Sequence, residues 1–264
     1  MKKMLCIFLC TLVLCGCSAK TTTVTSEDAS EYANLSNKSI GWGLKKNVNA
    51  PPDITQDTKE LMSKYGAYYI DVVPKTLYLT FDEGYENGYT GQILDVLKEN
   101  DVKAAFFITG PYLKKETELV RRMVDEGHTV GNHTLNHPSM PEVKDNEKLK
   151  KEITDLNDTF FDMFGQNMKY IRPPKGEYSE RTLALSNDLG YTSVFWSFAY
   201  QDWDTKKQKG TDYAYKQITD GVHDGCVLLL HAVSKDNADV LDRVIKDLKS
   251  KGYLFRSLDE FGIQ

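Results

Sequence analysis

From Thr76 onward, short continuous apolar runs alternate with longer stretches in which apolar residues recur every three or four positions. Such runs indicate strands buried on both faces, and the longer stretches indicate amphipathic helices. This alternation predicts an α/β fold, with a parallel sheet covered by helices. We expect strands at 76–81, 104–108, 129–132, 169–172, 191–196, 226–231 and 253–256.

The number of strands bears on how the sheet is arranged. Seven strands within about 190 residues suit a barrel better than an open sheet, although spacing alone allows either. In both folds, functional side chains gather where strands end and loops begin. Four unusual residues fall at or just past the end of a predicted strand, namely Asp82, His133, Arg172 and His231.

The N-terminus has the features of a bacterial lipoprotein signal. Residues 1–3 are basic, and the apolar run at 4–14 is too short to cross a bilayer as a helix. Leu14-Cys15-Gly16-Cys17 resembles a lipobox, which is cut before a cysteine that then carries lipid. We therefore predict a signal peptide at 1–16, a lipid anchor at Cys17 and an extracytoplasmic, membrane-attached protein. An ordinary cleaved signal and an uncleaved anchor are the alternatives.

Composition divides the rest of the chain. Residues 17–38, rich in Ser, Thr, Asn and Ala, predict a flexible tether. Residues 39–75 are expected to form an ordered lead-in segment, and residues 76–264 the main domain.

Signal cleavage would leave Cys226 alone in the domain, which excludes an internal disulfide and predicts a buried thiol. Cleavage also removes two lysines and no acid, so the net charge of −5 becomes −7. Without a basic cluster, nucleic acid is not expected as a partner.

Two adjacent carboxylates, Asp82 and Glu83, end the first predicted strand and precede Gly84. Like charges side by side raise each other's pKa, and burial raises it further, so the pair is costly at this place. An acidic turn that caps the next helix is one interpretation. A catalytic or metal-binding pair is the other, and the motifs downstream favour it.

His133 and His137 follow the strand predicted at 129–132. They would converge if the segment formed one helical turn, and a carboxylate from another strand end would complete an open metal site. A polar loop is the alternative.

Arg172 begins the stretch Arg-Pro-Pro-Lys-Gly, whose prolines fix the backbone and favour a guanidinium held against a carboxylate over a surface arginine. His231 ends a fully apolar strand, where a histidine is either a satisfied core residue or a catalytic one. His128 and His223 are interpreted as structural or exposed.

The acidic pair, the histidine pair, the Arg-Pro-Pro loop, Asp202-Trp203 and the strand-end histidine together resemble the motifs of polysaccharide deacetylases, the NodB-type carbohydrate esterases. The resemblance covers residues 76–259. Within it, residues 82–90, 179–185 and 230–238 are similar to the muramic-δ-lactam-forming peptidoglycan deacetylases of spore formers, as is the segment at 41–46. The family fold is a distorted (β/α) barrel with fewer than eight units, which agrees with the seven predicted strands.

The resemblance implies a role for each matching residue. Asp82 matches the catalytic base and Arg172 the residue that orients it, while His231 matches the general acid and Asp202 the carboxylate that tunes it. A divalent metal, zinc first among them, would be held by Glu83, His133 and His137. With the metal polarising the carbonyl, Asp82 would take a proton from water and His231 would protonate the leaving amine. The substrate groove is implied at Trp203 and Leu229.

Two positions depart from the family pattern. Glu83 stands where the family has an aspartate, so its longer side chain either still binds the metal or points away. Lys175 replaces an aromatic residue after Arg-Pro-Pro. This removes a stacking surface for the sugar and suits the lactyl or peptide carboxylate of muramic acid.

The implied activity is removal of acetyl from N-acetylmuramic acid in peptidoglycan glycan strands, leading to muramic-δ-lactam in the spore cortex. One alternative is a deacetylase of N-acetylglucosamine in peptidoglycan or chitin-like glycans. Another is a catalytically silent, glycan-binding lipoprotein. The intact acid and base residues favour an enzyme, because a binding module needs neither.

Overall fold

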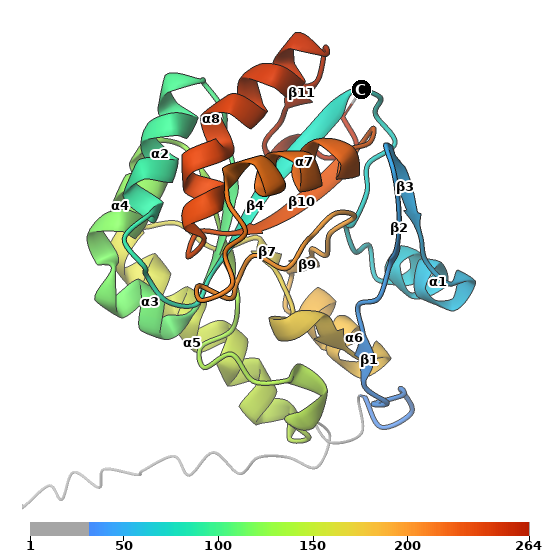
Figure 1. The fold of residues 1–264 in the computed structure, drawn as a ribbon. Coiled ribbons are helices and arrows are strands. Elements are labelled where there is room, and N and C mark those ends of the chain that lie inside the picture. The colour runs from blue at the N-terminus through green and yellow to red at the C-terminus, as the bar shows by residue number, and fades with distance from the viewer. Residues whose placement is uncertain (1–31, 264) are drawn as a thin grey trace, which may run out of the picture.

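The computed structural model describes residues 32–263 (Figure 1). Its main sheet is parallel and has the strand order β10-β4-β5-β6-β7-β9, with β11 paired to the start of β4. The predicted signal peptide, Cys17 and most of the predicted tether lie outside the described residues. All seven predicted strands are present: β4 (Thr76–Glu83), β5 (Ala105–Ile108), β6 (Thr129–Asn132), β7 (Tyr170–Ile171), β9 (Thr192–Ser193), β10 (Cys226–His231) and β11 (Leu254–Phe255).

The sheet curls into a barrel that closes irregularly. Regular pairing of β9 with β7 ends at Ser193, so the strand is shorter than the predicted 191–196. Beyond it, the N–H groups of Ser197 and Phe198 donate to the carbonyl of Val227 at 3.0 and 3.2 Å, and the Leu229 N–H donates to the Phe198 carbonyl at 2.8 Å. These bonds join the two edge strands through an irregular seam. The predicted distorted barrel is confirmed.

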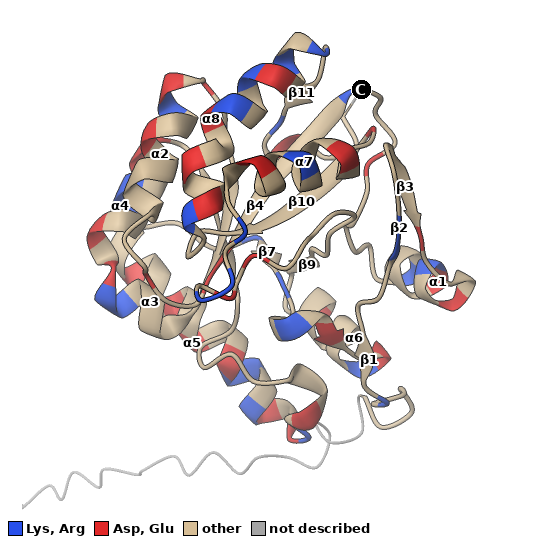
Figure 2. Cartoon of the chain, in the orientation of Figure 1, with Lys and Arg blue, Asp and Glu red and all other residues tan. Residues whose placement is uncertain are grey.

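Helices surround the barrel, and amphipathic patterns account for their positions (Figure 1). Ser179 caps α6, and the Thr182 side chain completes the capping box in place of the usual Glu or Gln. Figure 2 shows charged residues spread over the helices, while β10 and all but the end of β4 carry none. The helices are α2 (Thr90–Glu99), α3 (Gly110–Lys115), α4 (Thr117–Asp125), α5 (Asn146–Phe164), α6 (Glu180–Asp188), α7 (Thr211–Gly221) and α8 (Lys235–Ser250).

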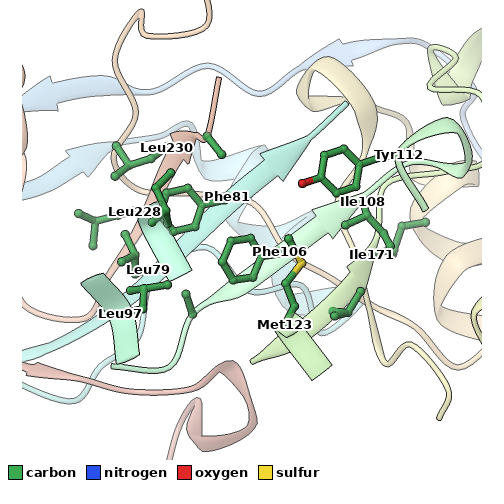
Figure 3. Packing of buried hydrophobic residues seen from close by; sticks show 14 of the residues in the cluster. Leu79, Phe81, Leu97, Phe106, Ile108, Tyr112, Met123, Ile171, Leu228 and Leu230 are labelled. Atoms are coloured by element: carbon green, nitrogen blue, oxygen red, sulfur yellow. The ribbon is translucent and has the colours of Figure 1, made fainter. Parts of the chain in front are cut away.

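The two faces of β4 belong to different parts of the core. Leu79 and Phe81 point outward and pack with the helix layer, together with Phe106 of β5 (Figure 3). Tyr78 points inward and packs inside the barrel with Phe107 and other inward residues. Because side chains alternate along a strand, successive residues at the end of β4 face opposite sides of the sheet.

Buried polar residues of the core agree with the predictions for them. Cys226 is a free, fully buried cysteine. His128 and His223 are buried, and burial lowers the pKa of His128 to about 4. Both are structural histidines, remote from the residues of the cavity described below. No helix within residues 32–263 combines the length and apolar character needed to cross a membrane.

The described chain begins with a segment, residues 32–42, that we call the N-terminal strap. Tyr32 Oη donates to Asp188 at 2.9 Å, and Asn37 Nδ2 donates to the carbonyl of Pro141 at 3.0 Å. The strap ends in β1 (Ile40–Gly41), which pairs antiparallel with β8 (Glu177–Tyr178). Thus residues 32–38, within the predicted tether, lie against α6 and the turn η1 (Met140–Glu142).

After the strap come a hairpin, β2 (Lys45–Asn47) and β3 (Ala50–Asp53), and the helix α1 (Gln56–Lys64). Two further single turns complete the chain, η2 (Pro174–Gly176) and η3 (Leu258–Glu260). The turn η2 carries the end of the Arg-Pro-Pro loop. Gly176 there has φ +67°, and an added Cβ would lie 2.8 Å from Trp196 and 2.9 Å from Trp42, so only glycine fits.

Candidate active site

A cavity of about 800 Å³ opens at the carboxyl ends of the barrel strands. Of the residues predicted for the site, it is lined by Asp82, His133, His137, Lys175, Trp203, Leu229 and His231. Arg172 and Asp202 lie behind this surface and bond to residues that line it. Glu83 is the exception, because its side chain is not part of the cavity wall.

The first half of the cavity is built around Asp82, at the end of β4. Its Oδ1 accepts a hydrogen bond from Arg172 Nη1 at 2.8 Å, and its Oδ2 lies 3.6 Å from His133 Nε2. Arg172 is fully buried, stacks on Phe107 and donates from Nε to the Val194 carbonyl. Burial opposes ionisation of Asp82, but the charge and hydrogen bond of Arg172, together with the electrostatic effect of His133 and His231, outweigh burial and hold the pKa of Asp82 below its ordinary value. Asp82 is therefore an ionised proton acceptor at neutral pH.

The second half is built around His231, at the end of β10. His231 Nδ1 bonds Asp202 Oδ1 at 2.7 Å, and the His231 backbone N–H donates to Asp202 Oδ2 at 2.9 Å. An ionised carboxylate can only accept, so the proton lies on Nδ1 and Nε2 is left for the cavity. Burial alone would lower the pKa of His231, but Asp202 raises it above the ordinary value. His231 can therefore hold a proton for donation near neutral pH.

The sheet register places these two halves side by side. β4 and β10 are parallel neighbours, and His231 is the register partner of Asp82. Directly paired residues on neighbouring strands point to the same side of the sheet and lie about 5 Å apart at Cα. A proton acceptor and a proton donor thus face one cavity from adjacent strand ends.

The histidine pair converges, but not through the helical turn that we predicted. His133 to His137 form a loop in which Thr134 and His137 have φ of 65° and 58°. The two imidazole centroids lie 4.8 Å apart. Glu152 on α5 braces the loop by accepting from the backbone and side-chain N–H groups of Asn136, each at 2.8 Å. Lys175, which also lines the cavity, has a left-handed backbone too, with φ 59°. Such strained residues gather at functional sites.

Glu83 lies on the other face of β4, and the structure does not bring it to the histidine pair. Its side chain is fully buried, and neither carboxyl oxygen has a hydrogen-bond partner among the described residues. Burial, with the nearby Glu86 and Asp82, raises the pKa of Glu83 well above its ordinary value. Burial therefore favours the protonated, neutral form of Glu83. Strand alternation places this side chain in the helix layer, because it follows Asp82.

The two histidines fit a metal ion, although the predicted set of three does not form. No group of three or more His, Cys, Asp or Glu side chains within residues 32–263 is arranged to hold one. His133 Nδ1 bonds the Arg172 carbonyl at 2.8 Å, an arrangement that leaves Nε2 free to ligate. Burial lowers the pKa of His133 to about 4 and also lowers the pKa of His137, so both are neutral, as ligation requires.

Several residues of the site were not predicted. Tyr85, Thr109, Asn136 and Trp196 also line the cavity. Tyr85 lies in the stretch 82–90 that carried the resemblance, and Trp196 ends a predicted strand, so position along the chain was the available signal. Asn237, which donates to Asp202 Oδ2 at 2.6 Å, lies in the stretch 230–238 that also carried the resemblance, although no role was predicted for it.

Comparison with known proteins identifies the class to which this fold and site belong. Residues 70–194 match the family model described as polysaccharide deacetylase. Together with the relatives described next, this match shows that the chain belongs to the polysaccharide deacetylase family.

The peptidoglycan-N-acetylmuramic acid deacetylase PdaA of Bacillus subtilis (strain 168) is 44% identical over 235 residues, which are 88% of this chain and 89% of PdaA. An uncharacterized 30.6 kDa protein of Geobacillus stearothermophilus is 53% identical over 231 residues, covering 86% of this chain and 87% of that protein. The solved structure of Bacillus subtilis PdaA, a family 4 carbohydrate esterase, superposes with a TM-score of 0.84 at 43% identity. It covers 86% of this chain and 98% of that one.

Proposed function

We propose that this chain hydrolyses the acetamide of N-acetylmuramic acid in peptidoglycan, releasing acetate and leaving an amine on C2 of the sugar. The observation that carries the proposal is the register pairing of Asp82 with His231 at one cavity. Each is held by its own buried partner, Arg172 for the acceptor and Asp202 for the donor. The similarity to PdaA, named for that substrate, supports the choice of sugar.

The chain's own residues account for the proton transfers of amide hydrolysis. Asp82, ionised and held by Arg172, takes a proton from a water molecule as its oxygen attacks the acetyl carbonyl carbon. His231 donates a proton from Nε2 to the amide nitrogen as the C–N bond breaks, so that the nitrogen leaves as an amine. Asp202 stabilises the protonated imidazole before that donation.

The histidine pair gives the cavity a place for a divalent ion, which we propose to be zinc, held by His133 and His137. When bound, such an ion polarises a carbonyl oxygen and lowers the pKa of water. Glu83 is not part of this proposal, because its side chain lies on the other face of β4.

A preference for muramic acid would come from Lys175. Its side chain is exposed and lines the cavity, so a cation is available for the lactyl or peptide carboxylate that N-acetylglucosamine lacks. Trp203, 52% exposed and beside His231 in the cavity wall, offers a flat surface to a sugar ring. Leu229 presents an apolar wall for the acetyl methyl group.

The product and the location complete the proposal. The amine freed on C2 can attack the lactyl carbonyl of the same sugar, forming the lactam C–N bond as the lactyl group loses water from a free carboxyl or the stem-peptide amine from an amide. The product is muramic-δ-lactam, the modification of the spore cortex. Peptidoglycan lies outside the cytoplasmic membrane, and a lipid on Cys17 would keep the enzyme at that surface.

The test is acetate release by the purified protein from glycan strands with and without stem peptides, and from N-acetylglucosamine oligomers. We expect release from the muramic substrates, loss after chelation and recovery with zinc. Lys175→Gln should lower the preference for muramic substrates about tenfold, because one charged contact is removed. Exposed Lys114→Gln on α3, away from the cavity wall, is the matched control.

The other outcomes separate the alternatives. Equal release from N-acetylglucosamine oligomers would replace the muramic preference with the broader glycan deacetylase. Glycan binding without acetate under any condition would favour the silent binding lipoprotein. Activity that survives chelation would remove the metal and leave the acid and base roles in place.

A further inference from the structure

The acid half of the cavity rests on neutral side chains for which no role was predicted. They join the irregular loop at 199–210, which carries Asp202, to the first turn of α8. We call this network the α8 clamp, and it consists of Tyr200, Gln208, Ser234 and Asn237.

Asn237 controls the carboxylate of Asp202. It is 1% exposed, and its Nδ2 donates to Asp202 Oδ2 at 2.6 Å and to the His231 carbonyl at 3.3 Å. Its Oδ1 accepts from the hydroxyl of Tyr200. This donor fixes the amide orientation, because a flipped amide would turn its oxygen toward the carboxylate. With Oδ2 held in this way, Oδ1 of Asp202 remains for His231 Nδ1.

Gln208 controls the backbone of the same loop. Its Nε2 donates to the carbonyls of Asp202 and Asp204, both at 3.1 Å. Its Oε1 accepts from Ser234 Oγ at 2.7 Å and from the Asp236 N–H at 3.3 Å. Ser234 is the N-cap of α8, and its Oγ accepts from the Asn237 N–H. One glutamine therefore ties the loop to the helix start that carries Asn237.

The part of the loop that carries Asp202 has no regular secondary structure to position it. Asp202 belongs to no helix or strand, yet its carboxylate is buried and sets the tautomer of His231. A proton donor displaced by about 1 Å can cost about 10²-fold in rate. The clamp supplies the rigidity that a strand supplies on the Asp82 side.

We infer that Asn237 and Gln208 are positioning residues of the reaction, which orient Asp202 so that His231 presents Nε2 to the cavity. The inference rests on the proposed function, in which His231 donates the proton. Neither Asn237 nor Gln208 lines the cavity, so both act through the Asp202–His231 pair.

The kinetic test uses alanine variants of the full chain. Asn237→Ala should lower kcat about 10²-fold with KM within twofold, because the carboxylate loses a donor without any change in the cavity wall. Gln208→Ala should lower kcat about tenfold and also raise KM, because its loop carries Trp203. A kcat within twofold of wild type for Asn237→Ala would overturn the inference.

Matched controls separate positioning from stability. Asn100→Ala removes a donor to Asp242 of α8 at 2.9 Å, and Gln92→Ala removes donors to Ala238 and Asp239. Both join α2 to α8 outside the cavity, and both should leave kcat unchanged. If these variants lost as much activity as the clamp variants, the loss would follow from weakened packing of α8 and the inference would fail.

An isosteric variant adds a readout that a purely structural role would not move. In Asn237→Asp, two contacting carboxyl groups share a proton at low pH and repel each other once it is lost. The ratio of variant to wild-type activity should therefore be near one at low pH and fall as the pH rises. A ratio independent of pH would count against the role. The ionisable groups facing this position are Asp202, His231, Tyr200, Asp236 and Lys46, with Asp82 and Arg172 facing His231.

A spectroscopic arm makes the result independent of activity. The Nδ1–H proton of His231, bonded to Asp202, should give a downfield NMR signal that is absent from His231→Ala. We expect the signal to weaken or vanish in Asn237→Ala and to persist in Asn100→Ala. An unchanged signal in Asn237→Ala would overturn the positioning role even if the protein released no acetate, an outcome that would separately remove the proposed function.

Discussion

Asp82 and Glu83 are neighbours at the end of β4, yet they meet opposite environments. Asp82 faces the inside of the barrel, where Arg172 lies 2.8 Å away and keeps its pKa low. Glu83 faces the helix layer, where no described donor reaches its carboxyl oxygens and burial raises its pKa. The comparison teaches that a charged partner such as Arg172, and not the residue type, decides which of the two carboxyl groups can act in acid–base chemistry.

The largest effect should come from removing the inward carboxylate. Asp82→Asn takes away the proton acceptor while keeping its shape, and the rate of acetate release should fall about 10³-fold. The matched change on the outward face, Glu83→Gln, should leave the rate within about threefold. If the two variants lost activity equally, the contrast between the faces would be wrong.

The carboxylate of Asp202, which holds His231, should determine how the activity depends on pH. Asp202→Asn removes the charge that raises the pKa of His231, so burial prevails and the pKa falls below its ordinary value of 6.5. The high-pH limb of the kcat profile should therefore move to lower pH, with about 10²-fold less activity at neutral pH. If the high-pH limb did not move, it would report the titration of a group other than His231.

The amount of bound zinc distinguishes the inward face of the sheet from the outward face without a measurement of activity. His133→Ala removes a nitrogen ligand, and bound zinc should drop from stoichiometric to background, as measured by elemental analysis after dialysis. Glu83→Gln and Glu83→Asp should retain the wild-type metal content, because neither changes the inward face. Loss of zinc in Glu83→Gln would restore Glu83 as a ligand.

The smallest effect concerns stability on the outward face. A carboxyl with a raised pKa keeps its proton in the folded chain at a pH where the unfolded chain releases it. The free energy of unfolding therefore falls as pH rises from about 4.5 toward the raised pKa, by at most about 1.4 kcal/mol per pH unit. Glu83→Gln should remove this slope, making the variant as stable as wild type near pH 4 and more stable at pH 8.

Chemical denaturation at both pH values measures that difference. The exposed Glu99→Gln on α2 serves as the control and should follow the wild-type slope. Parallel slopes for wild type and Glu83→Gln would mean that Glu83 is ionised in the folded chain.

Much of this architecture follows from local pattern. The apolar runs predicted the strands because a strand buried on both faces has no polar side, and β10 reads Cys-Val-Leu-Leu-Leu-His without a break. The positions of Asp82, Arg172 and His231 at strand ends followed from the same runs. The cavity residues could thus be predicted because parallel strands end at one edge.

What the pattern missed depends on length and on contacts between distant segments. The first strand was predicted to end at residue 81, but β4 continues to Glu83. Because Asp82 and Glu83 are both part of the strand, their side chains lie on opposite faces of the sheet. The histidine loop converges through left-handed residues that no periodicity signals. The contact of Asn237 with Asp202 spans 35 positions and depends on the fold to bring α8 against the loop that carries Asp202.

The N-terminal strap has a mechanical consequence. A pull on the chain ahead of Tyr32 would meet its contacts in series, first Tyr32 with Asp188, then Asn37 with Pro141, and then the two-residue pairing of β1 with β8. Behind these stands Trp42, whose N–H groups donate to Gly176 and Trp196, beside Lys175 and the cavity wall. A force applied to the chain ahead of Tyr32 would therefore load α6, η1 and β8 before it reached the cavity wall.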